Sequence, residues 1–128
     1  MALAEQKKAK RKHIVRPDGE GEIDKLWLPP KHFQQLYDDA QVTIEEASKV
    51  WGYTCTGWEH QCRFNTYPAG GPGYFSHQDY SEVDQTKVTL IQAVSDFTGG
   101  EVKIIGRFSV ALEPNDVLVF PGFVQHEI

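Results

Sequence analysis

The strongest constraint on the fold is a change in the spacing of apolar residues near residue 53. Before this point apolar side chains recur at helical spacing, at Phe33, Leu36, Tyr37 and Ala40. After it, apolar and polar residues alternate, which is typical of strands that bury one face. The sequence therefore predicts a helical first part followed by a β-structure.

Six segments after residue 53 have the composition of short strands. Turns rich in glycine, proline, asparagine and aspartate separate most of them. The segments are 58–65, 88–94, 101–105, 108–112, 117–120 and 123–128. Short strands at this spacing, preceded by helices, predict a mainly β fold, a β-sandwich or jelly roll with N-terminal helices packed outside it.

Two helices are predicted before the strands. Pro29 and Pro30 can open the first, because the missing N–H of proline costs nothing in the first turn of a helix. Thr43 and Glu46 have the spacing of a capping box, so a second, short helix is expected to begin there and to end near Gly52. Both helices are expected to act as packing elements.

Residues 1–25 are expected to form a basic, flexible tail and loop, and residues 26–128 a single domain. Residues 1–16 hold six basic side chains and one acidic side chain, and the segment 16–22 is polar and turn-rich. The whole chain of 128 residues nevertheless has a net charge of −5, so the domain itself is acidic. This length allows one domain with a hydrophobic core.

The charge pattern bears on partners and location. An acidic domain argues against nucleic-acid binding, because phosphate contacts need a basic face, and leaves only the basic run 7–12 for that role. No signal peptide or membrane-spanning run is present in the sequence, so no membrane partner is expected. Cys55 and Cys62 are predicted as free thiols in a reducing compartment. We expect a cytoplasmic protein, with a nuclear address in the basic run as the alternative.

The residues that carry chemistry begin with a histidine and an aspartate two positions apart. On an extended strand His77 and Asp79 project from the same face, so their side chains can converge on one ion. A second histidine on a neighbouring strand would complete the two-histidine, one-carboxylate set of non-haem Fe(II) sites. His126, on the last predicted strand, is the candidate. The alternative on this motif alone is an exposed His–Asp pair and a buried histidine bonded to a carbonyl.

Four segments, in order, resemble the prolyl 4-hydroxylase type of Fe(II)- and 2-oxoglutarate-dependent dioxygenase. Tyr67, a glycine-rich loop and segment 73–79 are similar to the family's segment from a tyrosine to the His-x-Asp motif. Segment 88–101 is similar to a core strand followed by a Gly-Gly-Glu turn. Segment 112–120 is similar to the proline turn and apolar strand that precede the distal histidine, which His126 matches.

This resemblance implies a double-stranded β-helix, in the jelly-roll and cupin class, with a metal site near one open end. It implies that His77, Asp79 and His126 bind Fe(II), with 2-oxoglutarate and O₂ as cosubstrates and ascorbate as a further candidate. Tyr67 matches a tyrosine that reaches the cosubstrate; an ordinary strand aromatic is the alternative. The implied reaction is hydroxylation of a C–H bond, in prolyl residues of a protein or in a small molecule.

One expected feature of the family has no match in the sequence. After the distal histidine a further core strand carries an arginine or lysine that pairs with the far carboxylate of 2-oxoglutarate. Here the last residue, Ile128, follows two positions after His126, so this strand is expected to be lacking. The sequence is then a fragment, or another chain supplies the strand, or an internal base acts instead. The candidate internal bases are Arg63, Lys87, Lys103 and Arg107.

Two further functions stay open beside the hydroxylase. A non-catalytic interaction module would keep the fold and the metal without turnover, and the unmatched basic anchor favours it. A cupin-like metalloenzyme would act without a 2-oxo acid. These three functions differ in whether metal binding, 2-oxo acid binding and turnover occur together, so binding and turnover assays together separate them.

Overall fold

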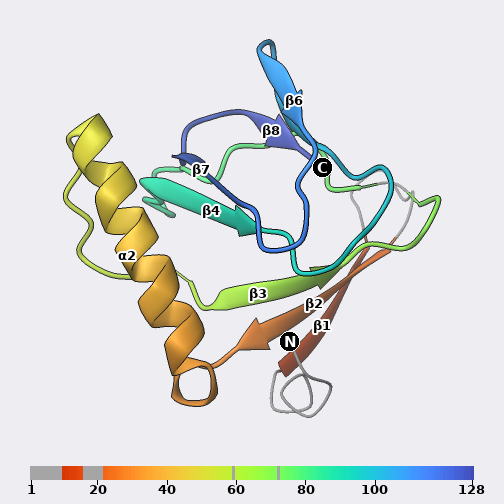
Figure 1. Ribbon diagram of the computed structural model, residues 1–128, viewed down its shortest axis with the longest axis horizontal. Coiled ribbons are helices and arrows are strands. Elements are labelled where there is room, and N and C mark those ends of the chain that lie inside the picture. Colours follow the sequence, from red (N-terminus) through yellow and green to blue (C-terminus); the bar gives the residue numbers. More distant parts are fainter. Residues whose placement is uncertain (1–9, 16–21, 59, 72) are drawn as a thin grey trace.

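The structure is a computed structural model that describes residues 10–15, 22–58, 60–71 and 73–128 (Figure 1). Its elements in chain order are β1 (Lys10–Val15), β2 (Glu22–Leu28), the 3-10 turn η1 (Pro30–His32), α2 (Gln34–Trp51), β3 (Cys62–Thr66), β4 (Val88–Gln92), β5 (Val102–Ile104), β6 (Phe108–Val110), β7 (Val117–Pro121) and β8 (His126–Glu127). The prediction of a mainly β fold with a helical segment before most of the strands is confirmed. Each of the six predicted strand segments overlaps an observed strand.

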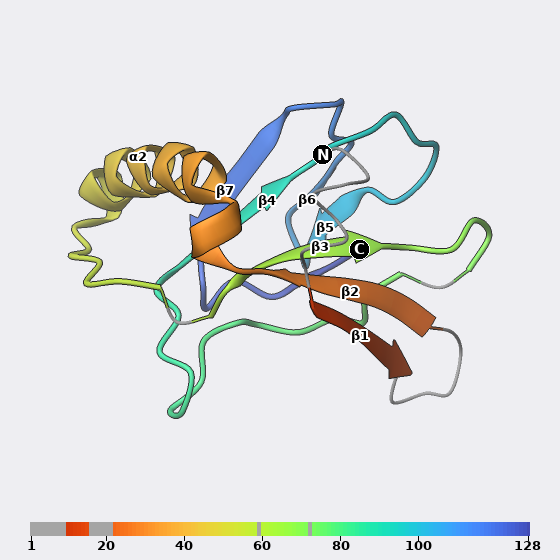
Figure 2. The ribbon, with the colours of Figure 1, turned by 90° about the horizontal axis from the view of Figure 1, so that it is seen from below.

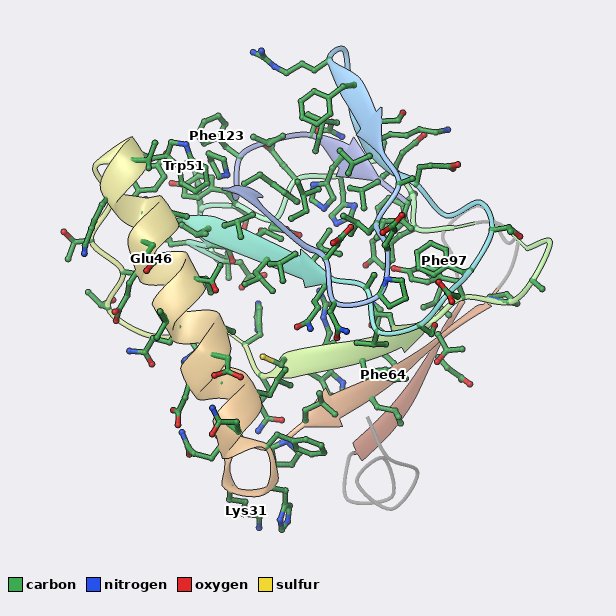
Figure 3. The ribbon with its side chains drawn as sticks, viewed as in Figure 1. Lys31, Glu46, Trp51, Phe64, Phe97 and Phe123 are labelled. Atoms are coloured by element: carbon green, nitrogen blue, oxygen red, sulfur yellow. The ribbon has the colours of Figure 1, made fainter. Side chains whose placement is uncertain are left out.

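The first sheet is antiparallel, in the order β1-β2-β3, and α2 lies beside it, next to the end of β2 and the start of β3 (Figure 1). Because side chains alternate along β2, Leu26 and Leu28 face the helix while Lys25 and Trp27 lie on the other face. Leu26 and Leu28 form a buried cluster with Phe33 and Tyr37 of the helical segment, and Leu36, Cys62 and Phe64 pack against it. Lys31 and Glu46 project outward from the helical segment (Figure 3).

The structure differs from the prediction of a flexible tail and loop over residues 1–25. Residues 10–15 form β1 and pair one by one with residues 22–27 of β2. The charged sequence of β1 concealed this strand, because an edge strand is held by backbone hydrogen bonds and tolerates charged side chains. Residues 1–9 and 16–21, the remainder of the predicted tail and its loop, lie outside the described residues.

The prediction of two helices is wrong, because α2 is continuous through the expected break at Thr43. No glycine or proline interrupts the chain there. The Thr43 hydroxyl donates to the Asp39 carbonyl at 3.3 Å, a bond within the helix rather than a cap. The predicted end is confirmed: Gly52 has a φ of 72°, and its N–H points at the carbonyls of the last helical turn.

The later strands pair in a nested order. His77 forms a bridge with His126, β4 pairs with β7, and β5 pairs with β6, all antiparallel. The chain between residues 77 and 126 is therefore a two-stranded ribbon that folds over itself, and β5 also pairs with β8 to join two turns of this ribbon. The side chains of this folded ribbon form a second buried cluster. It consists of Val102, Ile104 and Phe120, with Ile91, Leu112, Leu118, Val124 and Ile128 packed against it.

Viewed after a quarter turn, α2 lies beside β4 and β7, and β1 lies at the far edge of the first sheet (Figure 2). The helix thus contacts both the first sheet and the ribbon. Within the described part of the chain, no helix has the length and apolar character needed to cross a membrane.

Tyr37 fastens α2 to the first sheet. Its hydroxyl donates to the Leu28 carbonyl at 2.6 Å and accepts the Cys62 N–H at 2.7 Å, so one side chain bonds to both β2 and the start of β3. Burial raises the pKa of Tyr37 to about 12, and the phenol stays protonated at neutral pH. The hydroxyl therefore remains available as both donor and acceptor.

Replacing Tyr37 with phenylalanine is expected to lower the free energy of unfolding by about 1–3 kcal/mol, because it leaves a buried carbonyl and a buried N–H unpaired. Urea unfolding monitored by tryptophan fluorescence measures this change. Tyr53→Phe is the matched control, since Tyr53 is only half-buried, and it should shift stability by less than about 0.5 kcal/mol. Equal stabilities of the two variants would contradict this role of Tyr37.

Candidate metal centre

The structure brings together the three residues predicted as metal ligands. His77, Asp79 and His126 each offer one ligand atom, and these atoms lie within 4.8 Å of one another. The Nε2 atom of His77 lies 3.3 Å from Asp79 Oδ1, and the Nε2 atom of His126 lies 3.7 Å from Asp79 Oδ2. The two imidazole rings are 4.3 Å apart between centroids. Both rings thus turn the same nitrogen toward one carboxylate.

Backbone pairing explains why the two histidines meet. The N–H of His77 donates to the His126 carbonyl and the N–H of His126 donates to the His77 carbonyl, each at 2.9 Å. Residues directly opposite in an antiparallel pair project their side chains from the same face. Asp79 comes two positions later, and its N–H donates to the Gly122 carbonyl at 2.9 Å, so its side chain returns to that face.

Gly122, which sequence reasoning missed, permits the close approach of the segments around Asp79. Its N–H donates to the Lys87 carbonyl at 2.9 Å. A Cβ atom at this position would overlap the Thr86 carbonyl, so a side chain would separate the two segments. The signal in the sequence was a glycine directly after a proline, between two apolar strand segments, and glycine is the residue type that permits a close backbone approach.

Both imidazoles are held in the tautomer that a metal ligand needs. The Nδ1 atom of His77 lies 2.7 Å from the Phe75 carbonyl oxygen, and that of His126 lies 3.0 Å from the Val124 carbonyl oxygen. A carbonyl only accepts, so each Nδ1 carries the proton and each Nε2 keeps its lone pair. Metal-binding histidines are commonly oriented by this kind of second hydrogen bond.

The surroundings also set the protonation states. Burial alone would raise the pKa of Asp79, but the adjacent His77 side chain, the hydrogen bond from the Thr89 hydroxyl and the nearby His126 ring together hold it below its usual value. Burial lowers the pKa of His126, outweighing the Val124 carbonyl and Asp79, which favour the protonated ring. At neutral pH the carboxylate is therefore charged and the His126 ring neutral, which are the states in which both bind metals.

Thr89, on β4, is a further residue of the site that sequence reasoning missed. Its hydroxyl donates to Asp79 Oδ2 at 2.5 Å and fixes the direction of the carboxylate. The sequence carried no signal for it, because threonine is common in strands and the contact depends on where β4 lies relative to Asp79. Asp79 keeps Oδ1 beside His77.

This donor set suits a divalent transition metal. Two imidazole nitrogens and one carboxylate fit the ligand preferences of Fe(II) and neighbouring metals, and three protein ligands leave coordination positions for other molecules. His77 and Asp79 are only partly exposed, with 22% and 20% of their side chains accessible. The alternative of a solvent-exposed His–Asp pair does not describe their surroundings, whereas its second part does describe His126, which is buried and bonded to the Val124 carbonyl.

A cavity of about 920 Å³ adjoins the cluster. His77 and Asp79 form part of its wall, together with Tyr74 and, from the first sheet, Trp27 and Arg63. The Arg63 guanidinium lies over the Trp27 ring at 5.4 Å. Ligand sites in proteins commonly have this size and mixture of aromatic and polar walls.

Tyr67 is not part of the group formed by His77, Asp79 and His126. Burial raises the pKa of Tyr67, and its hydroxyl lies 3.5 Å from the Asn65 side-chain nitrogen. The tyrosine whose ring contacts His77 is Tyr74, with 4.6 Å between ring centroids. The role of Tyr67 toward a cosubstrate stays a prediction.

The four candidate internal bases fall into two groups. Arg63 and Lys87 line the cavity but are exposed, and Lys87 lies over the Tyr80 ring. Lys103 and Arg107 are exposed away from the cavity wall, with Lys103 paired to Glu127 at 3.3 Å. A fifth base, Lys25 on β2, is buried, and sequence reasoning did not consider it.

Replacing His77, Asp79 or His126 with alanine is expected to reduce the affinity for Fe(II) or Mn(II) by more than about 100-fold. Loss of a partner that only orients a ligand already costs about 10- to 100-fold. Anaerobic titration followed by Mn(II) electron paramagnetic resonance measures the affinity. His60→Ala is the matched control, because His60 is exposed and pairs with Asp84 instead. Wild-type affinity in the three variants would refute the ligand assignment.

Replacing Thr89 with valine is expected to weaken metal binding by about 10-fold, because the nearly isosteric side chain no longer holds the Asp79 carboxylate. The same titration gives the affinity, and Thr98→Val, in an exposed loop, is the control. An unchanged affinity of Thr89→Val would show that Asp79 is oriented by other contacts.

Comparison with known proteins adds no assignment. No family model matches the chain, and no curated protein or solved structure matches it. The argument for function therefore rests on the side chains themselves: two Nε2 atoms facing one carboxylate, fixed by backbone and hydroxyl hydrogen bonds, in the wall of a cavity.

Proposed function

We propose that the protein is a non-haem Fe(II)- and 2-oxoglutarate-dependent dioxygenase of the prolyl 4-hydroxylase type, built on a double-stranded β-helix. The observation that carries this proposal is the cluster of His77, Asp79 and His126, whose ligand atoms and protonation states suit a divalent metal. The chain order of these residues, His-x-Asp first and the second histidine on a late strand, is that of the family the sequence resembles.

The nested strand pairing supports the proposed architecture. A jelly roll forms when a long two-stranded ribbon winds so that its turns lie in two facing sheets. Here the pair β4–β7 and the sheet β6-β5-β8 are successive parts of such a ribbon, and the His77–His126 bridge lies at its open end. The ligands therefore occur where a ribbon of this kind would hold a metal.

Fe(II) bound by His77, Asp79 and His126 would supply O₂ chemistry in which a 2-oxo acid loses CO₂ and a C–H bond is hydroxylated. In the balanced reaction one oxygen atom of O₂ enters succinate and the other enters the product alcohol. The residues of this chain contribute orientation and charge. Asp79 would offset part of the metal charge, and the Thr89 hydroxyl fixes that carboxylate.

The cavity supports a substrate that enters beside the ligands. Its walls combine the rings of Trp27, Trp58 and Tyr74 with polar groups, and its volume of about 920 Å³ can hold a cosubstrate together with one side chain of a peptide. We propose a prolyl residue of a protein as the substrate, with a small molecule as the alternative. The net charge of −5 favours the approach of a basic partner.

Anaerobic addition of Fe(II) and 2-oxoglutarate is expected to produce a weak visible charge-transfer band, and admission of O₂ is expected to release succinate. Absorbance spectroscopy and a succinate assay measure the two events, and Asp79→Ala, which lacks the carboxylate ligand, should give neither. Metal uptake without succinate would indicate a non-catalytic module. A metal spectrum that 2-oxoglutarate leaves unchanged would indicate a metalloenzyme without a 2-oxo acid, and either result would overturn the proposal.

A further inference from the structure

A lysine on β2 is buried beside the candidate metal centre. Lys25 has 1% of its surface exposed, less than any other charged residue whose burial the structure describes. It lies between Asp24 and Leu26, on the face of β2 that carries Trp27, a wall of the cavity. Lysine is almost never fully buried unless polar groups surround its amine, so the surroundings of this side chain are informative.

Tyr74 connects Lys25 to the metal centre. The Lys25 amine donates to the Tyr74 hydroxyl at 3.2 Å and lies 4.5 Å from the centroid of the same ring. The other side of the connection is His77, whose ring lies 4.6 Å from that of Tyr74. One aromatic ring therefore separates the amine from the first metal ligand, and this ring also lines the cavity.

Two more polar side chains lie close to this pair. Asn65 is opposite Lys25 in the pairing of β2 with β3, so both side chains project from the same face of the sheet. The Asn65 Oδ1 atom is buried and has no hydrogen-bond partner among the described residues, while its Nδ2 atom lies 3.5 Å from the Tyr67 hydroxyl. We call Lys25, Asn65, Tyr67 and Tyr74 the Lys25 cluster.

The Lys25 cluster has the composition of an anion site. The amine and the two phenols are hydrogen-bond donors, and an amide can turn to present its NH₂ group where its oxygen now lies. A buried amide oxygen without a partner usually marks a position that a ligand or water satisfies. A carboxylate in such a site receives charge-assisted hydrogen bonds, which are among the strongest in proteins.

We propose that the Lys25 cluster binds the distal carboxylate of 2-oxoglutarate, with Lys25 as the counter-charge and the Tyr74 hydroxyl as the neighbouring donor. This inference rests on the proposed function. Two methylene groups separate the distal carboxylate from the 2-oxo acid end of the molecule, which would lie at the metal. The Lys25 amine is likewise separated from His77, because the ring of Tyr74 contacts both side chains.

The other bases near the cavity are less suited to this task. Arg63 and Lys87 differ from Lys25 in being exposed to solvent. An exposed charge gains little from pairing because water screens it. A buried amine discriminates strongly between ligands with and without a matching charge.

Lys25→Met tests the proposal, because methionine fills similar space without charge. The affinities of the Mn(II)-loaded protein for 2-oxoglutarate and for 2-oxopentanoate, which has a methyl group in place of the distal carboxylate, are measured by anaerobic calorimetry. We expect Lys25→Met to weaken 2-oxoglutarate binding by about 10- to 100-fold. Binding of 2-oxopentanoate and of Mn(II) should change by less than about threefold, as should all three in the exposed control Lys49→Met.

The outcomes separate this inference from the function on which it rests. Unchanged 2-oxoglutarate affinity in Lys25→Met, or an equal loss for both acids, would overturn the role of Lys25 while leaving the proposed function standing. Wild-type protein that binds Mn(II) but neither acid would overturn both. If Lys25→Met does not fold, Tyr74→Phe keeps the ring and removes the neighbouring donor, and it should weaken 2-oxoglutarate alone by about 10-fold; no selective loss would refute the cluster.

Discussion

The reciprocal hydrogen bonds between His77 and His126 are the contact on which both the ribbon and the site depend. They join the two segments at the end of the ribbon, and they set the register that turns both imidazoles to the same face. Side chains in strands alternate, so a slip of one residue would turn His126 away from Asp79. The carbonyls of Phe75 and Val124 then select the ring nitrogen that each histidine presents. The chemistry at the site is thus specified mainly by main-chain geometry.

The two faces of the first sheet have different tasks. One face packs on α2 through Leu26, Leu28 and Phe64, and Tyr37 adds two hydrogen bonds to the sheet. The opposite face carries Lys25 and Asn65 and adjoins the cavity. The apolar face supplies packing energy, while burial of polar groups on the other face costs free energy unless they find partners. The packed face therefore allows the sheet to hold a polar arrangement beside the candidate metal centre.

Local patterns predicted the parts of this molecule that depend on neighbouring residues in sequence. The alternation of apolar residues predicted the later strands, the His-x-Asp spacing predicted that His77 and Asp79 share one face, and Gly52 marked the end of α2. The missed features depend on contacts between distant segments: β1 is held by pairing with β2, and Thr89 acts through the position of Asp79. Lys25 was predicted to end the tail and loop of residues 1–25. Its burial could not be foreseen, because only folding brings Tyr74 and Asn65 close to it. The family resemblance and the jelly roll remain predictions.

The three candidate ligands come from the two ends of the ribbon, His77 and Asp79 from the first segment and His126 from the segment that pairs with it. A metal ion held by them would act as a crosslink that closes a long loop of chain. Unfolding would then have to release the ion, so the folded state would gain stability in proportion to the logarithm of the free metal concentration. The fraction of the protein that is folded would therefore depend on the concentration of free metal around it.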